Sequence, residues 1–113
     1  MSHHAEFMAV LPEDVRAKVK ALHADDSLGH LERFDKVSDL ILSLPKDTQD
    51  KLLALPQPPS NPSVPAELQA KFDGIHKLPT LKERFAKTRE VIASLPEEVR
   101  DKIRAEIKSK MGL

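Results

Sequence analysis

The sequence predicts an all-α protein, and three observations support this fold class. Apolar residues recur at three- and four-residue intervals over most of the chain, which is the period of a helix face. A Leu-Pro or Val-Pro step followed within two residues by an acidic residue occurs four times and is typical of a helix start. Residues 32–54 and 83–105 are identical at 11 of 23 aligned positions, in Glu, Arg, Phe, Lys, Ile, Ser, Leu, Pro, Asp, Lys and Ala. The chain is therefore predicted to be a tandem helical repeat.

Composition limits the function classes. The chain has 113 residues, of which 40% are hydrophobic and 32% charged, values typical of one soluble globular domain. Eighteen basic and 18 acidic residues cancel, so we expect no nucleic-acid partner. The absence of cysteine excludes disulfides and thiolate chemistry. No apolar run approaches the ~20 residues that cross a bilayer, so no membrane insertion is expected.

Residues 1–10 are expected to be a flexible N-terminal tail. His3 and His4 fit a tag or cloning remnant as well as a natural sequence, and the segment has no charge and apolar order like a secretory leader. This tail is left out of the predicted fold.

Four short helices are each predicted to begin at a proline, namely Pro12, Pro45, Pro65 and Pro96. Proline suits the first helical position because its missing N–H would be unpaired there, and nearby carboxylates complement the helix dipole. In the first short helix Val15, Val19 and Leu22 form one narrow apolar stripe, and similar residues follow the other prolines. Each short helix is expected to bury one side only.

Two longer helices lie between the short ones, and each has a core-facing seam. The seam residues are Leu28, Leu31, Phe34, Val37, Ile41 and Leu44 in the first and Leu81, Phe85, Thr88, Ile92 and Leu95 in the second. Ser27 and Thr80 are the predicted N-caps, and Glu83 has capping-box spacing from Thr80.

The predicted architecture is two tandem three-helix modules, each short, long and short. Residues 11–56 form the first module, residues 57–63 a Pro-rich linker, and residues 64–113 the second module. Because a module of this size is marginal alone, the two are expected to dock into one six-helix domain.

Differences between the copies locate candidate partner- or ligand-binding residues. Leu42 and Leu53 lie off the main stripes, and Ala93 and Arg104 replace them in the second copy. This surplus apolar area either packs against the other module or the Pro-rich linker, or contacts a partner or ligand. Leu40 and the repeat-equivalent Phe34 and Phe85 complete the candidate set. A core this poor in aromatic residues could open for an acyl chain or pack tightly without one.

The sequence carries no catalytic or metal motif. Asp25 and Asp26 begin a loop that fails the EF-hand pattern, so weak divalent-cation binding there is only an alternative to a helix-capping acidic loop. His23 and His76 are expected to complement helix C-termini. Charged pairs such as Glu32-Arg33 are interpreted as solvated faces. With no nucleophile set and no glycine-rich phosphate loop, we expect neither an enzyme nor a cofactor.

A family resemblance comes from the run Ala24-Asp25-Asp26-Ser27-Leu28, then Lys36-Val37, Leu40-Ile41, Ser43-Leu44-Pro45 and Asp50-Lys51-Leu52. This pattern resembles the C-terminal part of the SXP/RAL family of nematode antigens. The second copy keeps Lys87, Val91-Ile92, Ser94-Leu95-Pro96 and Asp101-Lys102-Ile103 but has Leu78-Pro79-Thr80 at the loop. The resemblance implies an all-helical, usually secreted nematode protein without catalytic residues, and it transfers no functional residue.

Three functions follow as hypotheses. The leading one is a non-enzymatic helical interaction module that binds a protein partner through two similar faces. The second is a small carrier of a fatty acid or other apolar ligand in a cavity between the modules. The third is weak divalent-cation binding. The resemblance implies secretion if a leader was removed, and a cytoplasmic location is expected otherwise.

Overall fold

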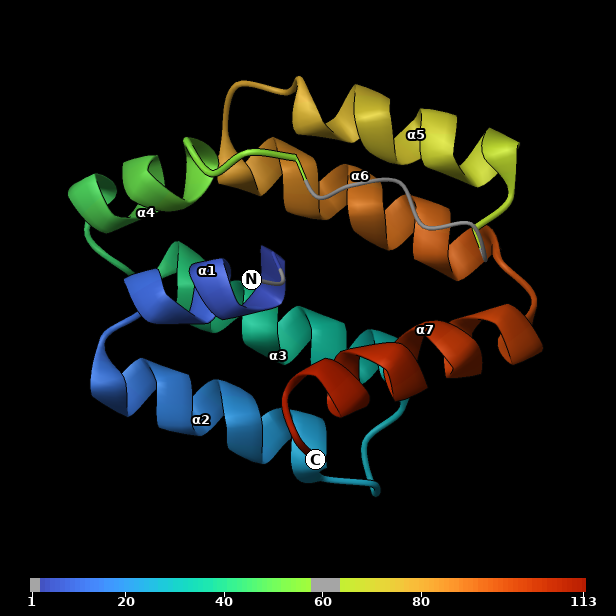
Figure 1. Ribbon diagram of the computed structural model, residues 1–113, viewed down its shortest axis with the longest axis horizontal. Helices are drawn as coiled ribbons and strands as arrows, with labels where there is room; N and C mark the ends of the chain where they lie inside the picture. The colour runs from blue at the N-terminus through green and yellow to red at the C-terminus, as the bar shows by residue number, and fades with distance from the viewer. Residues whose placement is uncertain (1–2, 58–63) are drawn as a thin grey trace.

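Seven α-helices make up the described part of the chain, residues 3–57 and 64–113 of a computed structural model, which contains no strand in these ranges (Figure 1). The helices are α1 (His3–Val10), α2 (Glu13–Ala24), α3 (His30–Leu42), α4 (Lys46–Leu53), α5 (Ala66–His76), α6 (Leu81–Ser94) and α7 (Glu97–Lys110). The predicted all-α class is confirmed. The radius of gyration, 13.5 Å, is that of a compact domain of this length.

The four proline steps begin helices as predicted. Pro12, Pro45, Pro65 and Pro96 are the N-cap residues of α2, α4, α5 and α7, with φ between −55° and −58°. Each proline therefore lies at the N-cap, one residue before the helix begins, rather than at the first helical position where it was predicted. Its carbonyl accepts the first helical N–H, as in the 2.9 Å bond from Arg16 N to Pro12 O.

The predicted short last helix of the second module is wrong, because α7 has 14 residues, as many as α6. The helices predicted to be long, α3 and α6, differ in how they start. Thr80 caps α6: its hydroxyl oxygen accepts a 3.1 Å bond from Glu83 N–H, and the hydroxyl donates to the Glu83 carboxylate. The predicted Ser27 cap is wrong, because α3 begins at His30 after Gly29. Ser27 instead donates its N–H and hydroxyl to Asp25 Oδ1, at 2.9 and 2.5 Å. The acidic residue two positions earlier thus takes the hydroxyl that would have capped the helix.

Thr80→Ala is expected to lower the free energy of unfolding by about 1 kcal/mol, because it leaves the Glu83 N–H without its cap. Ser27→Ala is the control: Ser27 lies in the loop before α3, two residues before the N-cap Gly29, and caps no helix, so its expected effect is below about 0.5 kcal/mol. Urea denaturation of both variants measures the difference. Equal losses would show that the Thr80 cap contributes nothing.

Residues 3–10 are not the flexible tail that the sequence suggested, because they form α1. Met8 is 7% exposed and Leu11, just after the helix, is 2% exposed. Both belong to the main hydrophobic cluster, and α1 lies against α4 and α7. An eight-residue helix is not stable by itself, so α1 forms because burial of the Met8 and Leu11 side chains stabilises it.

The long helices α3 and α6 lie side by side at the centre, with α2 packed on α3 and α5 on α6 (Figure 1). α7 lies against α3 and α1 rather than staying with α5 and α6. The rings of Phe34 and Phe85 meet edge to face across the α3–α6 contact, with centroids 6.3 Å apart. Arg89 of α6 also pairs with Asp35 of α3 at 2.7 Å.

Two groups of buried side chains hold these helices together. The first comprises Met8, Leu11, Val19, Ile41, Leu44, Leu52 and Leu81. The second comprises Leu68, Ile75 and Val91. The stripe positions of α2, α3, α5 and α6 therefore face inward as predicted. No helix in the described ranges has the length and apolar character needed to cross a bilayer. Apart from Gln57, the predicted Pro-rich linker lies outside the described residues.

Candidate ligand-binding cavity

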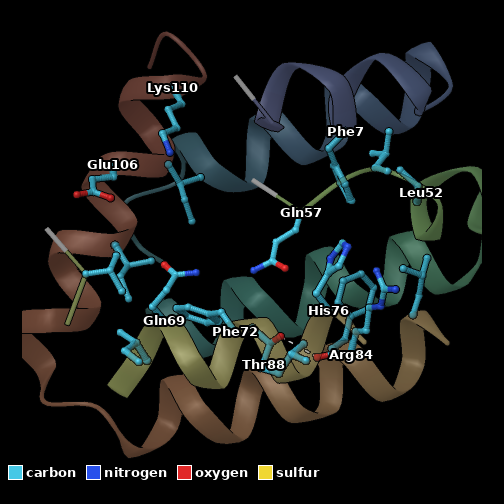
Figure 2. Close-up of a pocket in the computed structure, with 18 residues that line it drawn as sticks. Phe7, Leu52, Gln57, Gln69, Phe72, His76, Arg84, Thr88, Glu106 and Lys110 are labelled. Carbon is cyan, nitrogen blue, oxygen red and sulfur yellow. Dashed lines mark hydrogen bonds between the residues drawn. The ribbon is translucent and has the colours of Figure 1, made fainter. Parts of the chain in front are cut away.

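A cavity of about 410 Å³ lies among α1, α4, α5, α6 and α7 (Figure 2). Its lining is mainly apolar and includes Phe7, Leu52, Phe72, Phe85, Ile103 and Ile107. Phe7 points from α1 toward this space, and Phe72 borders it from α5. The volume lies in the range of roughly 300–1,000 Å³ found for small-molecule sites. We call this space the large cavity.

The apolar stripes of α5, α6 and α7 do not all pack against one another. They border the large cavity instead. Ile103 and Ile107 lie one turn apart on α7 and are only half-buried, and no residue of α7 is fully buried. Phe85 and Thr88 of α6 and Phe72 of α5 are also half-buried and border the same space. The side chains predicted to fill a core therefore surround a space.

A second space of about 250 Å³, the small cavity, lies among α1, α2, α3, α5, α6 and α7. It shares five lining residues with the large cavity: Phe7, Phe72, Thr88, Ile103 and Ile107. The two cavities therefore adjoin across these side chains. The polar side chains of the small cavity other than Thr88 are His23, His30 and Arg33, and its lining contains no acidic residue.

Arg33 is the most unusual residue of the small cavity. Its side chain comes from α3 and is only 2% exposed. Nε and Nη1 are buried and have no hydrogen-bond partner among the described residues, and no described carboxylate pairs with the guanidinium. Burial, with a smaller effect of nearby Arg104, lowers the pKa of Arg33 to about 10. The guanidinium is therefore still charged at neutral pH.

His30 lies one turn before Arg33 and is 8% exposed. Its Nδ1 is 3.0 Å from the carbonyl oxygen of Arg100, and since a carbonyl only accepts, Nδ1 carries the proton of this bond. Burial, followed by the charge of Arg33, lowers the pKa of His30 from its ordinary value of 6.5. His30 is thus neutral at pH 7 and fixes the start of α3 against α7.

Four polar side chains around the large cavity, those of Arg84, Thr88, Gln69 and Gln57, are hydrogen-bonded to the protein. Arg84, the repeat equivalent of Arg33, donates to the carbonyl oxygens of Leu78 at 3.0 Å and Leu53 at 3.4 Å. Thr88 donates its hydroxyl to Arg84 O at 2.7 Å, and Gln69 donates to the Asp73 carboxylate at 3.0 Å. Gln57 also donates to Asp73. Figure 2 shows the Gln57 side chain pointing into the large cavity. Arg33 differs from Arg84 in lacking such partners.

The structure places the five predicted binding residues in different surroundings. Phe34 and Phe85 come together, Phe34 lining the small cavity and Phe85 the large one. Leu42 and Leu53 are half-buried and pack against the main cluster, bordering neither cavity. Leu40 also packs there and borders a shallow surface groove between α2 and α3. Among described residues Leu113, 48% exposed, is the one large hydrophobic residue classed as exposed.

Asp25 and Asp26 are exposed and serve as hydrogen-bond and ion-pair partners. The bonds from Ser27 lower the pKa of Asp25, and the bond and charge of Lys108, 2.7 Å away, lower the pKa of Asp26. Nowhere in the described ranges do three His, Asp or Glu side chains gather as metal ligands would. The pair thus fixes its loop and the end of α7.

Sequence reasoning missed Phe7, Met8 and Arg33. The first two were assigned to a tail, and Arg33 was placed on a solvated face. A signal for Arg33 existed, because Val37 and Ile41 follow it at four-residue steps and continue the same inward face. Its burial on that face could have been inferred from this spacing.

Comparisons with protein-family models, curated proteins and solved structures found no match to this chain.

Proposed function

We propose that this protein is a non-enzymatic carrier that binds one apolar small molecule in the large cavity. The observation that carries this proposal is the 410 Å³ space, bordered by mainly apolar side chains from five helices. Small-molecule sites combine such an apolar lining with a few polar groups. The proposal therefore ranks the apolar-ligand carrier, the second hypothesis drawn from the sequence, above the protein-interaction module, which was the first.

Burial of the surplus leucines favours this order. Leu40, Leu42 and Leu53 are half-buried against the main cluster, so they offer little area for a protein partner. Interfaces between proteins need a contiguous exposed patch with apolar residues at its centre. A protein partner, and weak cation binding at Asp25 and Asp26, stay predictions.

The proposal includes the finer architecture, in which α2–α4 and α5–α7 are two copies of one unit. Phe34 and Phe85 are repeat equivalents, 51 residues apart, and their rings contact each other. Contact between equivalent residues is the signature of two-fold packing. The contacts of Arg84 with Leu53 O and of His30 with Arg100 O join the long helix of each copy to the last helix of the other. Such exchange supports the proposal of a cavity between two copies of an SXP/RAL-like repeat.

Native mass spectrometry and a fluorescent fatty-acid titration test the carrier proposal. The expected result is a saturable complex of one ligand per chain, with co-purified lipid where the expression host supplies it. Absence of both co-purified lipid and saturable binding would end the proposal.

Ile107→Phe is expected to weaken binding of the fluorescent fatty acid by roughly 10-fold or more, a loss of about 1.4 kcal/mol. Ile107 borders both cavities, so a larger side chain occupies space that the ligand needs. Ala105→Phe is the matched control, because Ala105 is an exposed residue of the same helix. Fluorescence titration of the three proteins measures the effect. Undiminished binding to Ile107→Phe would place the ligand elsewhere.

A further inference from the structure

We infer that Arg33 binds the acidic head group of the ligand, so that the natural ligand is an anionic amphiphile of the fatty-acid class. The inference rests on the carrier proposal and adds the chemistry of the ligand. The head group lies in the small cavity beside Arg33, and the hydrocarbon chain extends past Phe7 and Phe72 into the large cavity.

The first step is the state of Arg33 itself. The residue is only 2% exposed, and two nitrogens of its guanidinium, Nε and Nη1, are buried and have no hydrogen-bond partner among the described residues. Buried charged groups in proteins are generally paired, because an unpaired charge loses its hydration without compensation. A guanidinium has five N–H donors in one plane, which suit a carboxylate. A bound carboxylate would supply the missing partner.

The second step is the charge around the guanidinium. Among the described residues, no acidic side chain lines the small cavity, and the positive charge of Arg104 lies near enough to lower the pKa of Arg33. The chain as a whole is neutral, so this positive region is local. An anion is therefore the ligand group that this end of the site favours.

The third step is the comparison with Arg84. Both copies of the repeat have arginine at this position, but Arg84 donates to two backbone carbonyls of the protein. Arg84 therefore shows that the protein itself can supply hydrogen-bond acceptors to an arginine at this repeat position. Arg33 has the same charged side chain, but among the described residues its Nε and Nη1 have no such carbonyl partner.

The fourth step is that the two cavities adjoin. Five residues border both cavities, so a molecule with its head at Arg33 would pass between these side chains to place its chain in the large cavity. The side chains between them are mainly apolar: Phe7, Phe72, Ile103 and Ile107, with Thr88. The protein would thus hold a charged end in the small cavity and an apolar chain in the large one.

Displacement of the neutral probe N-phenyl-1-naphthylamine by dodecanoate and by 1-dodecanol tests the inference, since the two competitors differ in charge and share a twelve-carbon chain. Wild-type protein is expected to bind dodecanoate more tightly. Arg33→Met is expected to weaken dodecanoate binding by roughly 10-fold or more, as loss of a charged hydrogen bond does, with little change for dodecanol. Arg89→Met is the control, because Arg89 borders neither cavity. It should change neither affinity.

The outcomes separate the two proposals. If neither competitor displaces the probe and no fatty acid binds, the carrier proposal fails and this inference fails with it. If both compounds bind wild-type protein equally, or Arg33→Met keeps the preference for dodecanoate, the carrier stands and the role of Arg33 is wrong. Arg33→Lys provides a second variant should Arg33→Met not fold. It keeps the charge and should retain a preference for dodecanoate, and loss of that preference would count against a charge-based role.

Discussion

Replacing Met8 with alanine is expected to lower the free energy of unfolding by about 2–4 kcal/mol, as for other large-to-small core substitutions. Met8 is 7% exposed and packs in the main cluster, so its loss removes apolar burial and enlarges the small cavity that it borders. Urea denaturation of ligand-depleted protein is the measurement.

Ala9→Ser is the control for Met8→Ala, because Ala9 is the exposed neighbour on the same helix and its substitution should cost about 0.5 kcal/mol or less. The comparison tests whether α1 belongs to the folded domain. Equal, small effects at both positions would mean that residues 3–10 do not contribute to the core and that the large cavity lacks the wall formed by Phe7.

Phe34→Ala and Phe85→Ala are each expected to lower the free energy of unfolding by about 2–4 kcal/mol, somewhat less than for a fully buried phenylalanine. Both rings are half-buried and lie in edge-to-face contact at 6.3 Å. The double variant should lose less than the sum of the singles, with a coupling energy of about 0.5–1.5 kcal/mol for such an aromatic pair. A double-mutant cycle by urea denaturation measures this coupling.

The control cycle for this pair combines Phe34→Ala with Leu68→Ala. Leu68 lies in the second hydrophobic cluster, and the two losses are expected to add within about 0.5 kcal/mol. Additive losses for Phe34 and Phe85 would contradict the ring contact, and with it the two-fold relation between the repeat copies.

Much of the helix pattern could be predicted because it depends on neighbours in the sequence. The proline steps begin four helices, since proline has a fixed φ and no N–H to leave unpaired. Thr80 caps α6 for an equally local reason. Ser27 fails as a cap because Asp25 captures its hydroxyl, a competition between two local patterns that spacing does not rank. Helix α1 was missed because its stability comes from burial of Met8 in tertiary contacts.

The candidate site was less predictable because a cavity depends on the distances between helices. The seams containing Phe34 and Phe85 were predicted to face inward, and they do, but the sequence does not show that the stripes of α5, α6 and α7 fail to meet. Arg33 and Arg84 occupy equivalent positions of the repeat, and only the fold reveals that Arg84 has carbonyl partners, whereas Nε and Nη1 of Arg33 have no hydrogen-bond partner among the described residues.

A crystal structure of the protein with 12-bromododecanoic acid tests most directly whether the large cavity holds the ligand. The anomalous signal of bromine is predicted to lie in the large cavity near Phe72 and Phe85, with the carboxylate against Arg33 in the small cavity. Bromine on the outer surface, such as in the groove beside Leu40, or both cavities empty at saturating ligand, would contradict the account.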